Sequence, residues 1–200
     1  MSDIPDVLAL ATSPRRGGNT EILLDHMIVG MREVGGVVEK IYTPELDITG
    51  CSECNSCYRN GQCIIKDDYT ILYDKFLSCH RIVLASPVFF MNLCAQAKLI
   101  IDRSQCLWAM KYILKQCPFN EEELKHRKGI LISCGGTRGE HLFDCMNKTV
   151  KYFYDALFME FWDDLCVPRI DESGAILQHP EILDEAYRLG KRFITVQDNQ

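Results

Sequence analysis

Residues 6–20 read Asp-Val-Leu-Ala-Leu-Ala-Thr-Ser-Pro-Arg-Arg-Gly-Gly-Asn-Thr, and this stretch decides the fold. Its first half is a short apolar run, which is typical of a strand buried on both faces of a parallel sheet. Its second half is a polar loop with two adjacent glycines. From Asn19 to Val34 the apolar residues recur roughly at helical spacing, and Gly35-Gly36 ends that helix. The stretch therefore predicts a strand, a loop and a helix in succession.

The same order of elements repeats along the chain. Strands that alternate with helices form right-handed βαβ units, and these build a parallel sheet. Five such strands predict an α/β fold, namely a flavodoxin-like doubly wound five-stranded parallel sheet with helices on both faces. The length of 200 residues fits a single domain, 1–200, with a cysteine-rich insertion at about 43–68 after the second strand. We expect strands over 6–12, 37–42, 81–86, 129–133 and 161–167, and helices over 19–34, 69–77, 94–114, 140–158 and 180–195.

Composition narrows the class of protein. Hydrophobic residues make up 47% and charged residues 25%, as in ordinary globular proteins. The net charge of −6 argues against a general binder of nucleic acids or anionic membranes. The longest uncharged stretch, 82–97, falls short of the ~20 apolar residues of a membrane span. The N-terminus lacks the basic and apolar regions of a signal peptide, so we expect a cytoplasmic protein with no membrane or nucleic-acid partner.

The first loop suits a phosphate group. Its hydroxyls, arginines and flexible glycines lead directly into a helix, whose free N–H groups and dipole attract an anion. It carries neither Gly-Lys-Ser/Thr nor Gly-x-Gly-x-x-Gly, which disfavours ATP hydrolysis and a dinucleotide site. The alternative is an ordinary strand-to-helix turn with an Asn or Thr cap. The candidate phosphate-binding residues are Ser13, Arg15, Arg16, Gly18, Asn19 and Thr20.

Two further loops follow the third and fourth expected strands, at the same edge of the sheet. Loop 86–92 is apolar and aromatic, so it can shield a planar ring from water; a buried turn is the alternative. Loop 133–139 has glycines that let backbone N–H groups approach a ligand closely; a helix-entry turn is the alternative. The candidate ring-binding residues are Pro87, Val88, Phe89, Phe90, Met91, Asn92, Cys134, Gly135 and Gly136.

Three segments carry a family resemblance: Ser13-Pro-Arg-x-Gly-Gly-Asn-Thr20, Ser86-Pro-Val-Phe-Phe90 and Ala95-Gln-Ala-Lys-Leu-Ile-Ile-Asp-Arg103. With them, most of residues 6–140 resembles the flavodoxin-like NAD(P)H-dependent FMN reductases. The resemblance implies FMN, with its phosphate in the first loop and its ring between the second and third loops. The chain departs from the family in the extra basic Arg16, and in carrying phenylalanines in the second loop where a tyrosine is commoner.

The insertion carries four of the eleven cysteines, spaced Cys51-x2-Cys54-x2-Cys57-x5-Cys63. Cytosolic thiols stay reduced, so this spacing indicates a metal site or redox chemistry. Thiolates at three-residue steps can each bind one iron of a cuboidal cluster. Zinc more often uses two separated Cys-x2-Cys pairs, and reactive thiols are the other alternative. The motif resembles that of the iron–sulfur flavoprotein branch of the same family, which implies a [4Fe–4S] cluster on these four cysteines.

The resemblance also implies a function. A flavin exchanges two electrons as hydride or one at a time, and a cluster exchanges one at a time. We therefore expect an FMN-dependent oxidoreductase that couples two-electron and one-electron carriers, with NAD(P)H as a transient cosubstrate. We expect a small-molecule or protein electron donor and acceptor, and a homodimer or homotetramer. We expect no catalytic side-chain acid or base, and Lys98, Asp102 and Arg103 predict a local ion pair.

The sequence leaves three alternative functions open. One is a plain NAD(P)H-dependent FMN reductase or quinone reductase whose cysteines are structural. Another is a non-enzymatic redox carrier that binds FMN. The third is a zinc-bearing interaction module on an α/β scaffold.

Overall fold

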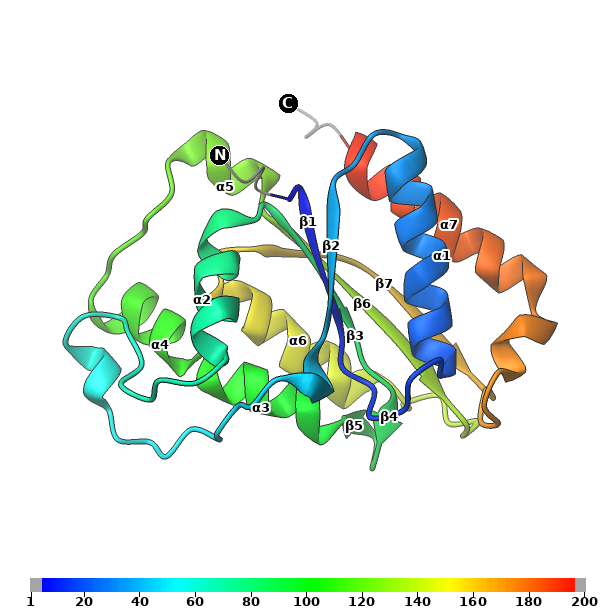
Figure 1. The fold of residues 1–200 in the computed structure, drawn as a ribbon, viewed down its shortest axis with the longest axis horizontal. Coiled ribbons are helices and arrows are strands. Elements are labelled where there is room, and N and C mark those ends of the chain that lie inside the picture. The colour runs from blue at the N-terminus through cyan, green and yellow to red at the C-terminus, as the bar shows by residue number, and fades with distance from the viewer. Residues whose placement is uncertain (1–4, 197–200) are drawn as a thin grey trace.

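A computed structural model describes residues 5–196, and its centre is a five-stranded parallel sheet (Figure 1). The strand order is β2-β1-β3-β6-β7, which is that of flavodoxin-like folds. The fold class predicted from the sequence is therefore confirmed. The strands are β1 Val7–Ala11, β2 Val38–Tyr42, β3 Arg81–Ala85, β6 Lys128–Gly135 and β7 Glu160–Pro168.

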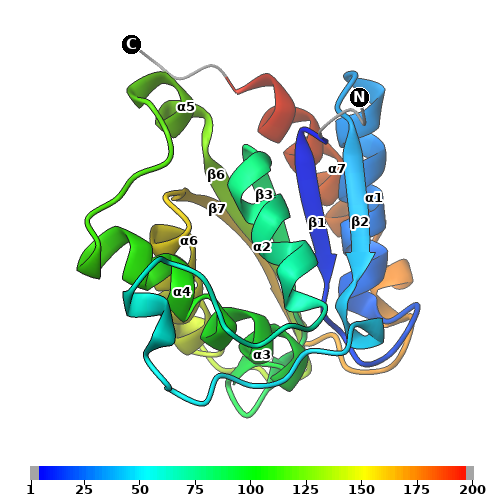
Figure 2. The same ribbon diagram turned by 60° about the vertical axis from the view of Figure 1, so that its left-hand side comes forward.

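Helices cover both faces of this sheet, and the two views agree on their sides (Figures 1 and 2). One face packs against α1 (Asn19–Glu33) and α7 (Pro180–Thr195). The other packs against α2 (Tyr69–Ser78), α3 (Ala95–Arg103), α4 (Gln105–Trp108) and α6 (Asp144–Ala156). The smaller elements are a hairpin of β4 (Val88–Phe89) and β5 (Asn92–Leu93), helix α5 (Glu121–His126), a π-helical turn at Ala109–Ile113, and 3-10 turns at Thr43–Glu45, Ser56–Tyr58 and Ala175–Gln178.

The apolar run in β1 explains why the sheet is covered on both faces. Val7, Ala9 and Ala11 belong to the core beneath α1 and α7. Leu8 and Leu10 belong to the core beneath α2, α3 and α6. Successive side chains of a strand point to opposite faces, so a strand between two helical layers needs an apolar residue at every position.

Most expected elements match, and the differences have local causes. The helix expected over 94–114 is divided into α3, α4 and the π-helical turn. The helix expected over 140–158 begins only at Asp144, because tight turns first bury Leu142 against Gly135 of the preceding strand. The hairpin and α5 were not expected. Among residues 5–196, no helix is long and apolar enough to cross a membrane.

Two glycines set how closely α1 and α7 approach. A Cβ atom on Gly190 would lie 2.1 Å from the carbonyl oxygen of Met27, and one on Gly30 would lie 2.0 Å from that of Tyr187. Backbone atoms cannot move aside as a side chain can. We therefore expect Gly190→Ala to lower the free energy of unfolding by about 2 kcal/mol, as overpacking of a close contact does.

Urea unfolding followed by circular dichroism measures this loss. Gly50→Ala is the matched control, because its Cβ would meet only Leu99 at an ordinary 3.6 Å. Equal stability losses in the two variants would contradict the explanation by close helix approach.

Candidate functional site

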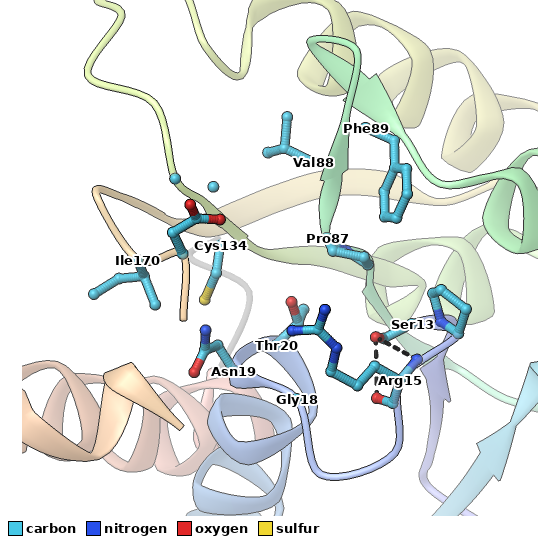
Figure 3. Close-up of a pocket in the computed structure, with 14 residues that line it drawn as sticks. Ser13, Arg15, Gly18, Asn19, Thr20, Pro87, Val88, Phe89, Cys134 and Ile170 are labelled. Carbon is cyan, nitrogen blue, oxygen red and sulfur yellow. Dashed lines mark hydrogen bonds between the residues drawn. The ribbon is translucent and has the colours of Figure 1, made fainter. Parts of the chain in front are cut away.

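The loops that follow β1, β3, β6 and β7 border one cavity of about 210 Å³ at the carboxyl edge of the sheet (Figure 3). This is the edge at which open α/β sheets bind ligands. Most candidate ligand-binding residues from the sequence line it. They are Ser13, Arg15, Gly18, Asn19, Thr20, Pro87, Val88, Phe89, Cys134, Gly135 and Gly136.

The first loop presents a helix N-terminus and a free cation to this cavity. Gly18 occupies the N-cap of α1, and no side chain caps the helix there. Ser13 Oγ accepts a hydrogen bond from the Arg15 N–H and donates one to the Arg15 carbonyl, which shapes the turn. Among the described residues, the Arg15 guanidinium has no hydrogen-bond or ion-pair partner. The N–H groups of α1 and this guanidinium together suit an anion.

Glu21 stabilises the first loop. Its carboxylate accepts a hydrogen bond of 2.7 Å from the Gly17 N–H and pairs with Lys40 at 2.7 Å. Burial alone raises the pKa of Glu21, but these two hydrogen bonds outweigh it and the net pKa is lowered. The carboxylate therefore stays charged. The Gly17 N–H is already used and is not free for a ligand.

Arg16 does not line the cavity. Its guanidinium pairs with Glu45 and lies over the Tyr42 ring, 3.7 Å from the centroid. The side chain therefore joins the first loop to the end of β2. Arg15 and Arg16 are adjacent in sequence but face different surroundings.

The tip of the second loop also lies outside the cavity lining. Phe90 and Met91 have positive φ angles of 49° and 62°, which turn the chain between β4 and β5. Phe90 is fully exposed, and Met91 is exposed as well. The Asn92 side chain accepts a hydrogen bond from the Leu93 N–H at 2.8 Å. Phe89 is the aromatic residue of this loop that reaches the cavity.

The third loop has glycine at two positions, so its backbone packs closely on the residues around the cavity. A Cβ on Gly135 would lie 2.8 Å from Val88 Cγ2, and one on Gly136 would lie 2.7 Å from Asp171 Cγ. Cys134 is buried, and burial raises the pKa of its thiol to about 12 despite an opposing hydrogen bond with Thr20. Cys134 therefore lines the cavity with an uncharged thiol.

Sequence reasoning missed three lining residues: Pro14, Ile170 and Asp171. The last two follow β7, and a loop after the fifth parallel strand must reach the same edge, which was the available signal. Asn19 ties this loop to α1. Its Nδ2 donates to the Glu172 carbonyl at 2.8 Å, and its Oδ1 accepts from the Ile176 N–H at 3.2 Å.

The four cysteines of the insertion lie together around a second, small cavity of about 20 Å³, which Arg103, Gln105 and Cys106 also line. Burial, and then the charges of the three other cysteines, raise the pKa of the Cys57 thiol. Hydrogen bonds with Ser56 lower the pKa of the exposed Cys54 thiol. Within residues 5–196, no three His, Cys, Asp or Glu side chains are arranged to hold a single metal ion. The two cavities share no lining residue.

Arg103 holds the insertion against α3. Its guanidinium pairs with Asp67 at 2.6 Å and donates to the backbone carbonyl of Thr49 at 2.7 Å. The local ion pair expected on α3 forms only between Lys98 and Asp102, at 2.5 Å. The expected ion pair within the helix was therefore wrong for Arg103, because its side chain points into the insertion and pairs with Asp67 there.

Solved structures share the fold over nearly the whole chain. A flavone reductase covers 94% of this chain and 61% of its own, with a TM-score of 0.68 and 18% identity. An NAD(P)H:quinone oxidoreductase from Methanothermobacter marburgensis covers 97% of this chain and 98% of its own, with a TM-score of 0.71 and 13% identity. At these identities the likeness shows the fold alone. The protein is thus of the flavodoxin-like α/β class.

Sequence comparison identifies the family. The pattern of the NADPH-dependent FMN reductases matches residues 5–160, and the chain belongs to that family. An iron–sulfur flavoprotein from Archaeoglobus fulgidus is 35% identical over 142 residues, which span 70% of this chain and 59% of that protein. One from Methanosarcina thermophila is 26% identical over 149 residues, which span 74% of this chain and 71% of that protein.

These findings confirm the family and branch expected from the sequence. They also confirm an FMN-dependent oxidoreductase at the level of the family.

Proposed function

We propose that FMN binds in the cavity at the carboxyl edge of the sheet, with its phosphate at the N-terminus of α1. The observation that carries this proposal is the pairing of a helix N-terminus with the Arg15 guanidinium, neither of which has a side-chain partner in the part of the chain that the structure describes. Ser13 and Thr20 offer hydroxyl groups beside them. Helix N–H groups bind the phosphate and the guanidinium neutralises its charge.

The flavin ring occupies the part of the cavity between the second and third loops. Pro87, Val88 and Phe89 supply an apolar wall that excludes water from one side of the ring. Gly136 lets the third loop pack closely on Asp171, since a side chain there would meet it, and in this arrangement the backbone N–H groups of the loop serve the polar edge of the ring. These groups position the ring and tune its electronics, and no side-chain acid or base takes part in the reaction.

We further propose that Cys51, Cys54, Cys57 and Cys63 hold a [4Fe–4S] cluster. The four thiols border a common cavity. A cuboidal cluster takes one thiolate per iron, so its ligands surround a volume, whereas zinc takes four ligands at one point. The names of the iron–sulfur flavoprotein relatives support the same cofactor.

With both groups bound, FMN exchanges two electrons as hydride or one at a time, and the cluster exchanges single electrons. We infer an oxidoreductase that couples a two-electron carrier to a one-electron carrier, with NAD(P)H as a transient cosubstrate. Its donor and acceptor are small molecules or proteins, it works as a homodimer or homotetramer, and it resides in the cytoplasm.

One observation favours a second candidate. Cys51 and Cys54 are exposed, and no three of the described thiols are arranged to bind an ion. A plain NAD(P)H-dependent FMN or quinone reductase, with these thiols free, accounts for that arrangement.

An absorption spectrum of anaerobically purified protein, taken before and after dithionite, tests the proposal. We expect flavin bands over a broad cluster absorption that dithionite bleaches, with about one FMN and about four iron atoms per chain. Flavin without iron would favour the plain reductase. Iron without flavin would contradict the assignment of the carboxyl-edge cavity. Stoichiometric zinc would contradict the cluster.

A further inference from the structure

The Arg103 side chain is fully buried, and four hydrogen bonds use its two terminal nitrogens. Nη1 donates to the Thr49 carbonyl at 2.7 Å and to Asp67 Oδ2 at 2.6 Å. Nη2 donates to Asp67 Oδ1 at 3.1 Å and to the Ile65 carbonyl at 3.3 Å. Each terminal nitrogen carries two N–H groups, so these four contacts account for all of them.

The fifth N–H group of the guanidinium, on Nε, has no hydrogen-bond partner within residues 5–196. A buried donor without a partner loses its hydration and costs about 1–3 kcal/mol, and more for a charged group. Such a cost is unexpected in a side chain whose other donors are all satisfied. The Nε of Arg127 is also buried without a partner among the described residues, so only the surroundings of Arg103 connect its Nε to a bound group.

The surroundings identify that group. Arg103 lines the small cavity that Cys51, Cys54, Cys57 and Cys63 also line. Burial lowers the pKa of Arg103, but Asp67 and the nearby Cys63 thiol raise it, so the Cys63 thiol lies beside the guanidinium. A sulfur atom that is negatively charged accepts a hydrogen bond from such a donor.

We propose that Arg103 is a positioning and redox-tuning residue, whose Nε–H donates a hydrogen bond to the Cys63 sulfur when the cluster is bound. This inference rests on the cluster assigned under the proposed function. Reduction adds an electron to the cluster, and a nearby cation and an N–H···S bond stabilise that extra negative charge. Hydrogen bonds to the sulfurs and local charge set cluster potentials, so Arg103 makes the cluster easier to reduce.

Potentiometric titration of the cluster and the flavin in three variants tests the role. Arg103→Lys keeps the charge but removes Nε–H, so the cluster potential becomes more negative. Arg103→Gln also removes the charge, and the shift is larger. Asp67→Asn is the matched control: it weakens the anchoring ion pair but removes a negative charge near the cluster, so its shift is positive, opposite to that of the two arginine variants. The flavin potential stays unchanged in all three, since Arg103 does not line the FMN cavity.

A measurement on the unaltered protein does not depend on how the variants fold. In the reduced holoprotein, pulsed EPR should detect a weak nitrogen coupling that changes when arginine is labelled with ¹⁵N. Iron-loaded protein without that coupling, or an Asp67→Asn shift as negative as that of Arg103→Lys, would overturn the tuning role alone. Wild-type protein that binds no iron would overturn the proposed cluster and this inference with it.

Discussion

Replacing Cys57 by alanine is expected to remove most of the iron from the protein while FMN stays bound. Cys57 stands in the middle of the cysteine motif, and its thiol is half-buried at the cavity that the other three cysteines line. Each iron of a cubane cluster needs one thiolate, so a missing central ligand opens the cluster to loss of iron. The cavity proposed for FMN shares no lining residue with this one, so we expect flavin binding to be independent of it.

The measurement is the iron and FMN content of protein purified without oxygen. We expect iron to fall from about four atoms per chain to below about one, with FMN unchanged. Cys145→Ala is the matched control, because Cys145 is an exposed thiol on α6, outside both cavities. Iron that survives in Cys57→Ala, or falls equally in the control, would count against the four-cysteine site. Equal loss of FMN and iron would count against separate sites.

The sheet could be predicted from the sequence because its signal is local. A run such as Val7–Ala11, apolar at every position, is needed wherever helices cover both faces of a strand. The hairpin of β4 and β5 has no such signal. Its strands have two residues each, and its turn needs positive φ at Phe90 and Met91, residue types that disfavour that conformation. Val88 and Leu93, on either side of the turn, pack against the core, and such tertiary contacts leave no local pattern in the sequence.

The candidate site was predictable as far as topology determines it. Parallel strands end at one edge, so the loops at Ser13, Pro87 and Gly135 had to meet. Side-chain direction was not predictable. Nothing local in the sequence distinguishes Arg15, which lines the cavity, from Arg16, which turns to Glu45.

Long-range side-chain partners could not be predicted from the sequence for the same reason. Arg103 pairs with Asp67, far from it in sequence, although Asp102 is its immediate neighbour. Helical spacing describes only contacts within one helix, and the insertion packs on α3 through the tertiary fold.

Replacing Arg15 by alanine is expected to weaken FMN binding by about tenfold to a hundredfold, which is the range for a charge-assisted hydrogen bond to a phosphate. Arg15 lines the cavity proposed for FMN, and among the described residues it has no carboxylate partner that the substitution would leave unpaired. The loss therefore falls on ligand binding and leaves the stability of the ligand-free protein nearly unchanged.

Arg16→Ala is the control for charge, because it removes the same positive charge one residue away from a side chain directed at Glu45 and Tyr42. We expect its effect on FMN affinity to stay within about twofold, as for an exposed ion pair. Fluorescence titration of the flavin-free protein with FMN and with riboflavin separates the contributions. Only the phosphate contacts Arg15 in the proposed orientation, so Arg15→Ala should lower affinity for FMN and leave that for riboflavin nearly unchanged. If both ligands weaken equally, Arg15 acts on the ring or on the fold of the loop, and the phosphate does not lie at the N-terminus of α1.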